Sequence, residues 1–157
     1  MKGKGNSLVN SVITAGLLTG TLDITAASLQ YFERTGKGPG NVLRFIASGV
    51  FGTKAFAGGM AMAAWGLLLH YIIAFLFTIA FFLLYPTISL LKINRVVAGI
   101  LYGVLVWAVM NLLVLPASLA PPIPFHTGRA LVAAGILVAC IGLPLSYLAN
   151  KYYLYKK

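Results

Sequence analysis

The chain alternates between four long apolar stretches and short connections that are polar or rich in proline and glycine. A helix needs roughly 20 mostly apolar residues to cross a hydrocarbon core of about 30 Å. Each stretch reaches that length, so the pattern predicts one all-α membrane domain over residues 1–157, a bundle of four transmembrane helices. The predicted spans are residues 8–31, 58–85, 96–115 and 127–149.

Residues 41–57 lie between the first two spans and do not fit the pattern of a span. Their apolar positions follow helical spacing, but the segment is short and also contains Arg44 and Lys54. We interpret it as an interfacial amphipathic helix, with a re-entrant hairpin and a fifth span as the alternatives. A fifth span would place the two termini on opposite sides of the membrane.

Composition supports a membrane protein, with 60% hydrophobic and 9% charged residues. The net charge of +10 comes from basic residues scattered between the apolar stretches. Nucleic-acid binding needs a clustered basic stripe, so we expect anionic lipid headgroups and no nucleic acid as partners. Cys140 is the single cysteine, which excludes an intramolecular disulfide, and we interpret it as a buried, inert thiol.

Four spans place both termini on one side of the membrane. That side would carry seven basic residues and the other side five, so the positive-inside rule places the termini in the cytoplasm. The tail, residues 151–157, fits an aromatic and basic anchor at an anionic leaflet, or simply a solubilising helix end. The seven are Lys2, Lys4, Lys92, Arg95, Lys151, Lys156 and Lys157, and the five are Arg34, Lys37, Arg44, Lys54 and Arg129.

Each span carries small residues three or four positions apart on one face. Helices in lipid associate by close approach of their backbones, which such stripes permit. We therefore expect these faces to be the helix-packing contacts. Their glycines are Gly16, Gly20, Gly59, Gly66, Gly99, Gly103, Gly135 and Gly142.

Three of these stripes also carry a strongly polar side chain. Asp23, one of only two acidic residues, lies inside the first span, where a carboxylate is costly and normally has a partner. His70 lies at a similar depth in the second span, and a carboxylate near an imidazole can form a charge-assisted hydrogen bond. With Asn111 of the third span, these residues predict a proton-responsive or substrate-binding pocket. The alternative is that they only hydrogen-bond between helices.

Three residues at the start of the fourth span form a second candidate site. We expect Thr127 to cap this helix, while its positive N-terminal end and Arg129 attract an anion, with His126 near the mouth of the pocket. Alternatively, Arg129 extends to the interface and His126 is an ordinary loop residue.

Several chemistries are disfavoured by the sequence. It contains no phosphate-binding loop, no nucleophile elbow and no pair of metal ligands at helical spacing. We therefore predict no catalytic residue, no metal and no cofactor, and a protein that is not an enzyme. An enzyme acting on lipid headgroups has only His126 and Arg129 in its favour.

The order of short motifs resembles that of the YagU-like small bacterial inner-membrane proteins, four-helix proteins mostly of unknown function. The resemblance implies a bacterial inner-membrane location and no particular reaction. Residues 36–54 have no counterpart in that pattern. The motifs are Ala15-Gly16 and Gly20, Trp65-x4-His70, Tyr85-Pro86, and Gly99-x3-Gly103-x3-Trp107 with Pro116.

Two functions follow from these residues. The first is a small transport-like or proton-linked protein in which Asp23 and His70 titrate, working as an oligomer because four short helices enclose little pore. The second is a non-enzymatic accessory or scaffold subunit of a larger membrane complex, which its small-residue and aromatic faces would hold.

Overall fold

A computed structural model describes residues 7–155, apart from the side chains of Ile93 and Tyr155, and this part of the chain is helical without a strand. Four helices are long and apolar enough to cross a membrane: Leu8–Thr35, Gly59–Leu84, Arg95–Ala117 and Thr127–Leu154. The all-α fold with four candidate spans is thus confirmed. Lys2, Lys4, Lys156 and Lys157 of the predicted charge pattern lie outside the described residues.

The first two spans are continuous helices, and the other two are interrupted. Helix α1 is Leu8–Thr35 and α3 is Gly59–Leu84. The third span consists of α5 (Arg95–Val109), the π turn η2 (Met110–Val114) and α6 (Leu115–Ala117). The fourth consists of α7 (Thr127–Leu137), the π turn η3 (Val138–Gly142) and α8 (Leu143–Tyr155). Shorter elements connect the spans: α2 (Gly40–Phe51), the 3₁₀ turn η1 (Gly52–Phe56) and α4 (Ser89–Ile93).

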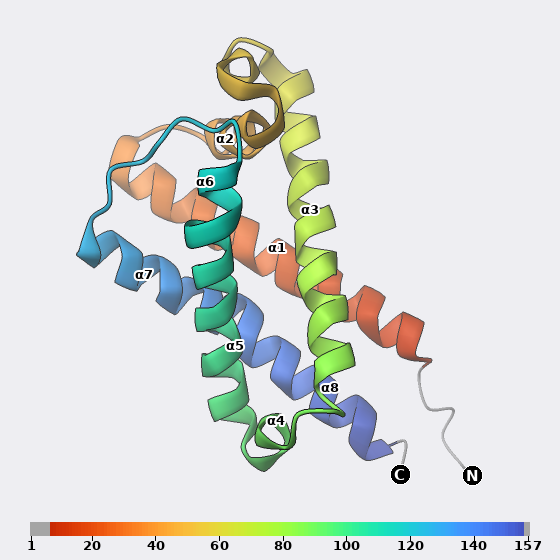
Figure 1. Ribbon diagram of the computed structural model, residues 1–157. Coiled ribbons are helices and arrows are strands. Elements are labelled where there is room, and N and C mark those ends of the chain that lie inside the picture. The colour runs from red at the N-terminus through yellow and green to blue at the C-terminus, as the bar shows by residue number, and fades with distance from the viewer. Residues whose placement is uncertain (1–6, 156–157) are drawn as a thin grey trace.

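The spans form two crossing layers (Figure 1). Helices α3 and α5 run side by side, and α1 and the α7–α8 helix pass diagonally behind them. The start of α1, the end of α8 and α4 lie at one end of the molecule, which we call the terminal end. Helix α2, η1 and the segment 118–126 lie at the opposite end. Both described chain ends therefore share one end, as four spans require.

Residues 41–57 form α2 and η1 and do not make a fifth span. Helix α2 is seen end-on in Figure 1, so it lies across the end of the bundle, between the tops of α3 and α6. A position at the membrane interface stays a prediction.

Each interrupted span opens into a π turn that ends two residues before a proline. η2 ends at Val114, before Pro116, and η3 ends at Gly142, before Pro144. A proline ring has no N–H and collides with the carbonyl four residues earlier, so the preceding turn widens to avoid it. In the fourth span, Pro144 is thus accommodated by the inserted π turn η3.

The tightest packing lies near the terminal end. Phe81 is completely buried and its ring centre lies 4.5 Å from that of Tyr102. The Tyr102 hydroxyl donates to the Phe77 carbonyl at 2.6 Å, which joins α5 to α3. This aromatic cluster consists of Phe81, Phe82, Tyr85, Tyr102 and Tyr153.

The tail tyrosines take part in this packing, and their role as a leaflet anchor stays a prediction. Tyr153 donates from its hydroxyl to the Phe82 carbonyl at 2.7 Å and stacks on Tyr85, with ring centres 5.5 Å apart. Asn150 donates to the Tyr85 hydroxyl at 2.7 Å. Helix α8 is thus fastened to α3 by the side chains of Asn150 and Tyr153.

Six of the eight predicted glycines face a neighbouring segment so closely that a Cβ would collide with it or crowd it. A Cβ built on Gly103 would lie 2.5 Å from the Cα of Val138, and one on Gly142 would collide with the Gly99 carbonyl. Gly66 faces the α2 backbone and not another span. Gly59 and Gly135 differ from the prediction because nothing lies within 4 Å of a Cβ at either position.

Candidate functional site

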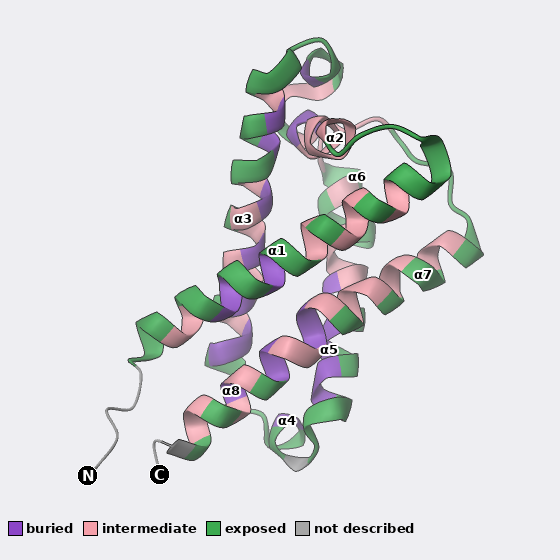
Figure 2. Ribbon diagram, turned by 180° about the vertical axis from the view of Figure 1, so that it is seen from behind, coloured by how far each residue is buried: buried purple, intermediate pink, exposed green. Residues whose placement is uncertain are grey.

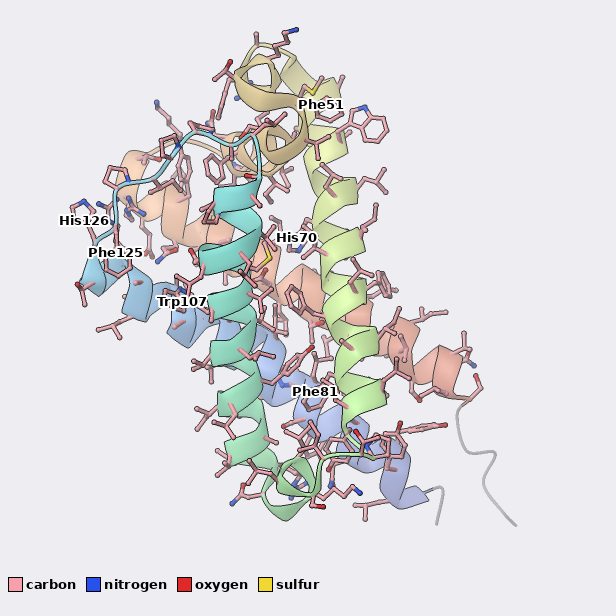
Figure 3. The ribbon with its side chains drawn as sticks, in the orientation of Figure 1. Phe51, His70, Phe81, Trp107, Phe125 and His126 are labelled. Carbon is pink, nitrogen blue, oxygen red and sulfur yellow. The ribbon has the colours of Figure 1, made fainter. Side chains whose placement is uncertain are left out.

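His70 is the centre of the candidate site. It lies on α3 with only 9% of its surface exposed, on the same buried face as Gly66 and Ala74. Its Nε2 is 2.8 Å from the carbonyl oxygen of Gly20 on α1. A carbonyl only accepts hydrogen bonds, so Nε2 carries the hydrogen, and Nδ1 is the nitrogen that can take up a further proton. Figure 3 shows the ring pointing from α3 into the bundle.

Asp23 lies about one helical turn after Gly20 on α1, on the side that approaches His70. Its carboxyl group is half-buried and interacts electrostatically with the His70 ring. The expected direct hydrogen bond between them is absent from the structure of residues 7–155, in which Nε2 bonds the Gly20 carbonyl. The two residues are therefore neighbouring ionisable groups without a direct hydrogen bond.

Cys140 is the residue of this site that the sequence analysis did not recognise. It lies in the π turn η3, is half-buried, and is close enough to Asp23 for that charge to act on its thiol. The thiol is therefore less buried than predicted, and its inertness stays a prediction. The available signal was Pro144, which lies one turn after Cys140. This proline widens the turn before it and so changes the face that Cys140 occupies.

Asn111 does not join Asp23 and His70. Its side chain is exposed on the outside of the bundle, and its Nδ2 donates to the Trp107 carbonyl of the same helix at 2.9 Å. The Trp107 indole nitrogen is buried and has no hydrogen-bond partner. The predicted three-residue cluster is therefore a pair on α1 and α3.

The predicted pocket mouth, His126, Thr127 and Arg129, also lies apart from Asp23 and His70. His126 and Thr127 are exposed at the start of α7, and Figure 3 shows His126 on the far side of the molecule from His70. Helix α7 begins at Thr127 with His126 as its N-cap and no side-chain capping bond, so Thr127 is not the cap. Arg129 is half-buried one turn further on.

The chemistry open to this site is proton exchange between neighbouring groups. Within residues 7–155, no three His, Cys, Asp or Glu side chains are grouped so that they could hold a metal ion. An apolar groove of ≈ 370 Å³ lies elsewhere, along the outer face of α3, and includes Tyr71 and Phe75. Figure 2 shows how little of each span is buried, as suits helices surrounded by lipid.

No protein-family model, no curated protein and no solved structure matches this chain.

Proposed function

We propose that the protein is a small multi-pass membrane protein of the transport-like, proton-linked kind, in which Asp23 and His70 take up and release protons. The observation that carries this proposal is the bond from Nε2 of His70 to the Gly20 carbonyl beside the Asp23 carboxyl group. It fixes the orientation of a buried imidazole and leaves Nδ1 as the atom that gains and loses the proton. Ionisable residues at such depth commonly mark ion and proton pathways.

The membrane proposed for it is the bacterial inner membrane, with both termini in the cytoplasm. Support comes from the excess of basic residues on the terminal side and from the resemblance to the YagU-like proteins. The same features favour a non-enzymatic role, and the positive charges would meet anionic lipid headgroups.

Replacing the carboxylate tests the proposal directly. In liposomes that contain the purified protein and a trapped pH-sensitive dye, a potassium diffusion potential should drive proton entry through the wild-type protein. We expect Asp23→Asn to reduce entry to the protein-free rate, because the amide cannot exchange a proton. Glu33→Gln is the matched control, since Glu33 is the other acidic residue and is exposed at the end of α1. Its entry rate should equal the wild-type rate.

Circular dichroism and size-exclusion chromatography establish that Asp23→Asn remains folded. A folded Asp23→Asn protein with wild-type proton entry would refute the proposal. His70→Gln should give the same loss, because an amide side chain retains a donor for the Gly20 carbonyl but has no titratable nitrogen.

Asn111 favours a second candidate, an accessory subunit or oligomer. Its exposed amide lies on a membrane-spanning surface, where a polar group is best satisfied by another helix. We expect wild-type protein under gentle extraction to run as a stoichiometric complex, and Asn111→Leu to weaken it by roughly 1 kcal/mol, the usual size of an interhelical polar contact. Leu113→Ala, at a position 64% exposed, is the control. Monodisperse wild-type monomer would contradict this candidate.

A further inference from the structure

Arg95 begins α5 at the terminal end, and α8 fixes its position there. The Ser146 hydroxyl donates to the Arg95 carbonyl at 2.7 Å, and Ser146 is only 1% exposed. The guanidinium carbon of Arg95 lies 5.3 Å from the centre of the Tyr147 ring. Such a cation–π contact restrains a guanidinium without using its N–H donors. The backbone and the side chain of Arg95 are therefore both positioned by adjacent residues of α8.

The donors of this guanidinium are unused. Arg95 is exposed, and within residues 7–155 its side chain makes the ring contact with Tyr147 but no hydrogen bond or ion pair. Its N–H groups form a planar fork that matches the oxygens of a phosphate or carboxylate. Tyr147 is 56% exposed, and its hydroxyl also lacks a hydrogen-bond partner in that part of the chain. The pair thus presents oriented donors to an external acceptor.

Lys151 extends the positive charge of this pair. It is exposed and follows Tyr147 by one turn of α8, on the same face. The chain has only two acidic side chains, and neither lies at this end. Asp23 is beside His70, and Glu33 is in the last turn of α1 at the opposite end (Figure 1). An anion from outside the protein is therefore the counter-charge open to Arg95 and Lys151.

The helix surface directly inward of Arg95 is apolar. Val96 is 57% exposed and Ile100 is 44% exposed, and both belong to a helix that is long and apolar enough to cross a membrane. An anion at Arg95 thus lies where the apolar surface of the span ends, which is the level of a phospholipid phosphate. The acyl chains of such a lipid fit along Val96 and Ile100, whereas a soluble anion gains nothing from that surface.

We propose that Arg95, Tyr147 and Lys151 form a binding site for the phosphate of an anionic phospholipid. The guanidinium fork holds the phosphate oxygens, the Tyr147 ring keeps the fork in place, and Lys151 adds a second positive charge. The site gives the proposed contact with anionic headgroups a specific location, and in that respect it rests on the proposed placement in a membrane. It does not depend on proton exchange at Asp23 and His70.

Native mass spectrometry of the detergent-purified full chain measures how tightly single lipids bind. The probes are dioleoyl phosphatidylglycerol, which is anionic, and dioleoyl phosphatidylcholine, which has the same acyl chains and a zwitterionic headgroup. We expect the wild-type protein to bind phosphatidylglycerol about tenfold more tightly, as hydrogen bonds between charged groups allow. Inorganic phosphate at the same concentration as the lipid should not displace it.

Arg95→Gln tests the central residue of the site. It keeps the carbonyl that Ser146 bonds but removes the charged fork, so phosphatidylglycerol binding should weaken about tenfold. Tyr147→Leu should weaken it about threefold by removing the cation–π contact. Lys54→Gln is the matched control, because it removes the same charge from an exposed residue of η1 at the opposite end. Its affinity should equal that of the wild type.

Equal weakening in Arg95→Gln and Lys54→Gln would overturn the site, because it would show a diffuse attraction to the net positive charge. Displacement of the lipid by inorganic phosphate would also overturn it, in favour of a site for a soluble anion. If Arg95→Gln did not fold, Lys151→Gln would test the same site, with an expected loss of about fivefold. Loss of proton entry in Asp23→Asn bears only on the proposed function, so the two proposals fail separately.

Discussion

Replacing Gly142 by alanine is expected to separate the third and fourth spans. The added methyl group would collide with the Gly99 carbonyl and lie 2.9 Å from the Gly103 nitrogen, and both obstacles are backbone atoms that no rotamer change can move. Overpacking a tight contact costs roughly 1–3 kcal/mol where side chains can adjust, and a contact between backbones belongs at the upper end or above. The free energy of unfolding, measured by denaturation in mixed micelles, should fall accordingly.

Gly135→Ala is the matched control for this prediction. It lies in the same span, carries the same substitution, and meets no atom within 4 Å. Alanine is favoured over glycine in a helix by about 1 kcal/mol, so this variant should be as stable as the wild type or slightly more so. Equal stability of the Gly142 and Gly135 variants would show that α5 and η3 are not in close contact.

Phe81→Ala should be the second severe change. The ring is completely buried between α3 and α5, and is packed against Tyr85 and Tyr102. Its removal leaves a cavity and removes many dispersion contacts, a loss of about 3–5 kcal/mol in the cores of soluble proteins. Within lipid, where no transfer from water is involved, we expect a loss of roughly 2–3 kcal/mol.

The control for Phe81→Ala is Leu83→Ala, two residues along the same helix. Leu83 is 61% exposed and faces outward, so its truncation should change the free energy of unfolding by less than about 0.5 kcal/mol. A similar loss of stability in both variants would contradict the described orientation of α3.

Much of the fold follows from hydrophobic length alone. The lengths of the apolar stretches give the four spans, and four spans place both termini at one end. Counting residues along the uninterrupted helices α1 and α3 also predicts that Asp23 lies close to His70. In those helices the α-helical period holds from end to end, so depth and face can be read from residue number.

The predictions fail where that period is broken. Gly135 and Gly142 are seven residues apart and would share a face in an α-helix, but the π turn η3 lies between them and turns Gly135 away from α5. The same turn brings Cys140 toward Asp23. Asn111 lies within η2, and its expected inward face was likewise inferred from unbroken α spacing.

Composition does not reveal the long-range contacts of two segments. Tyr152 and Tyr153 beside lysines have the composition of a headgroup anchor, but their partners Phe82 and Tyr85 lie far away in sequence and no local pattern reveals them. For α2, the close backbone contact with Gly66 depends on how α3 is placed.

The bonds from α8 to α3 also constrain how the protein is assembled in the cell. Helix α3 leaves the ribosome and enters the membrane well before α8 is synthesised. The Tyr85 hydroxyl and the Phe82 carbonyl therefore have no partner until Asn150 and Tyr153 of α8 are in place. The tightest part of the bundle therefore closes last, after the fourth helix has inserted. Until then the nascent protein presents an incomplete aromatic face, which membrane chaperones and proteases can recognise.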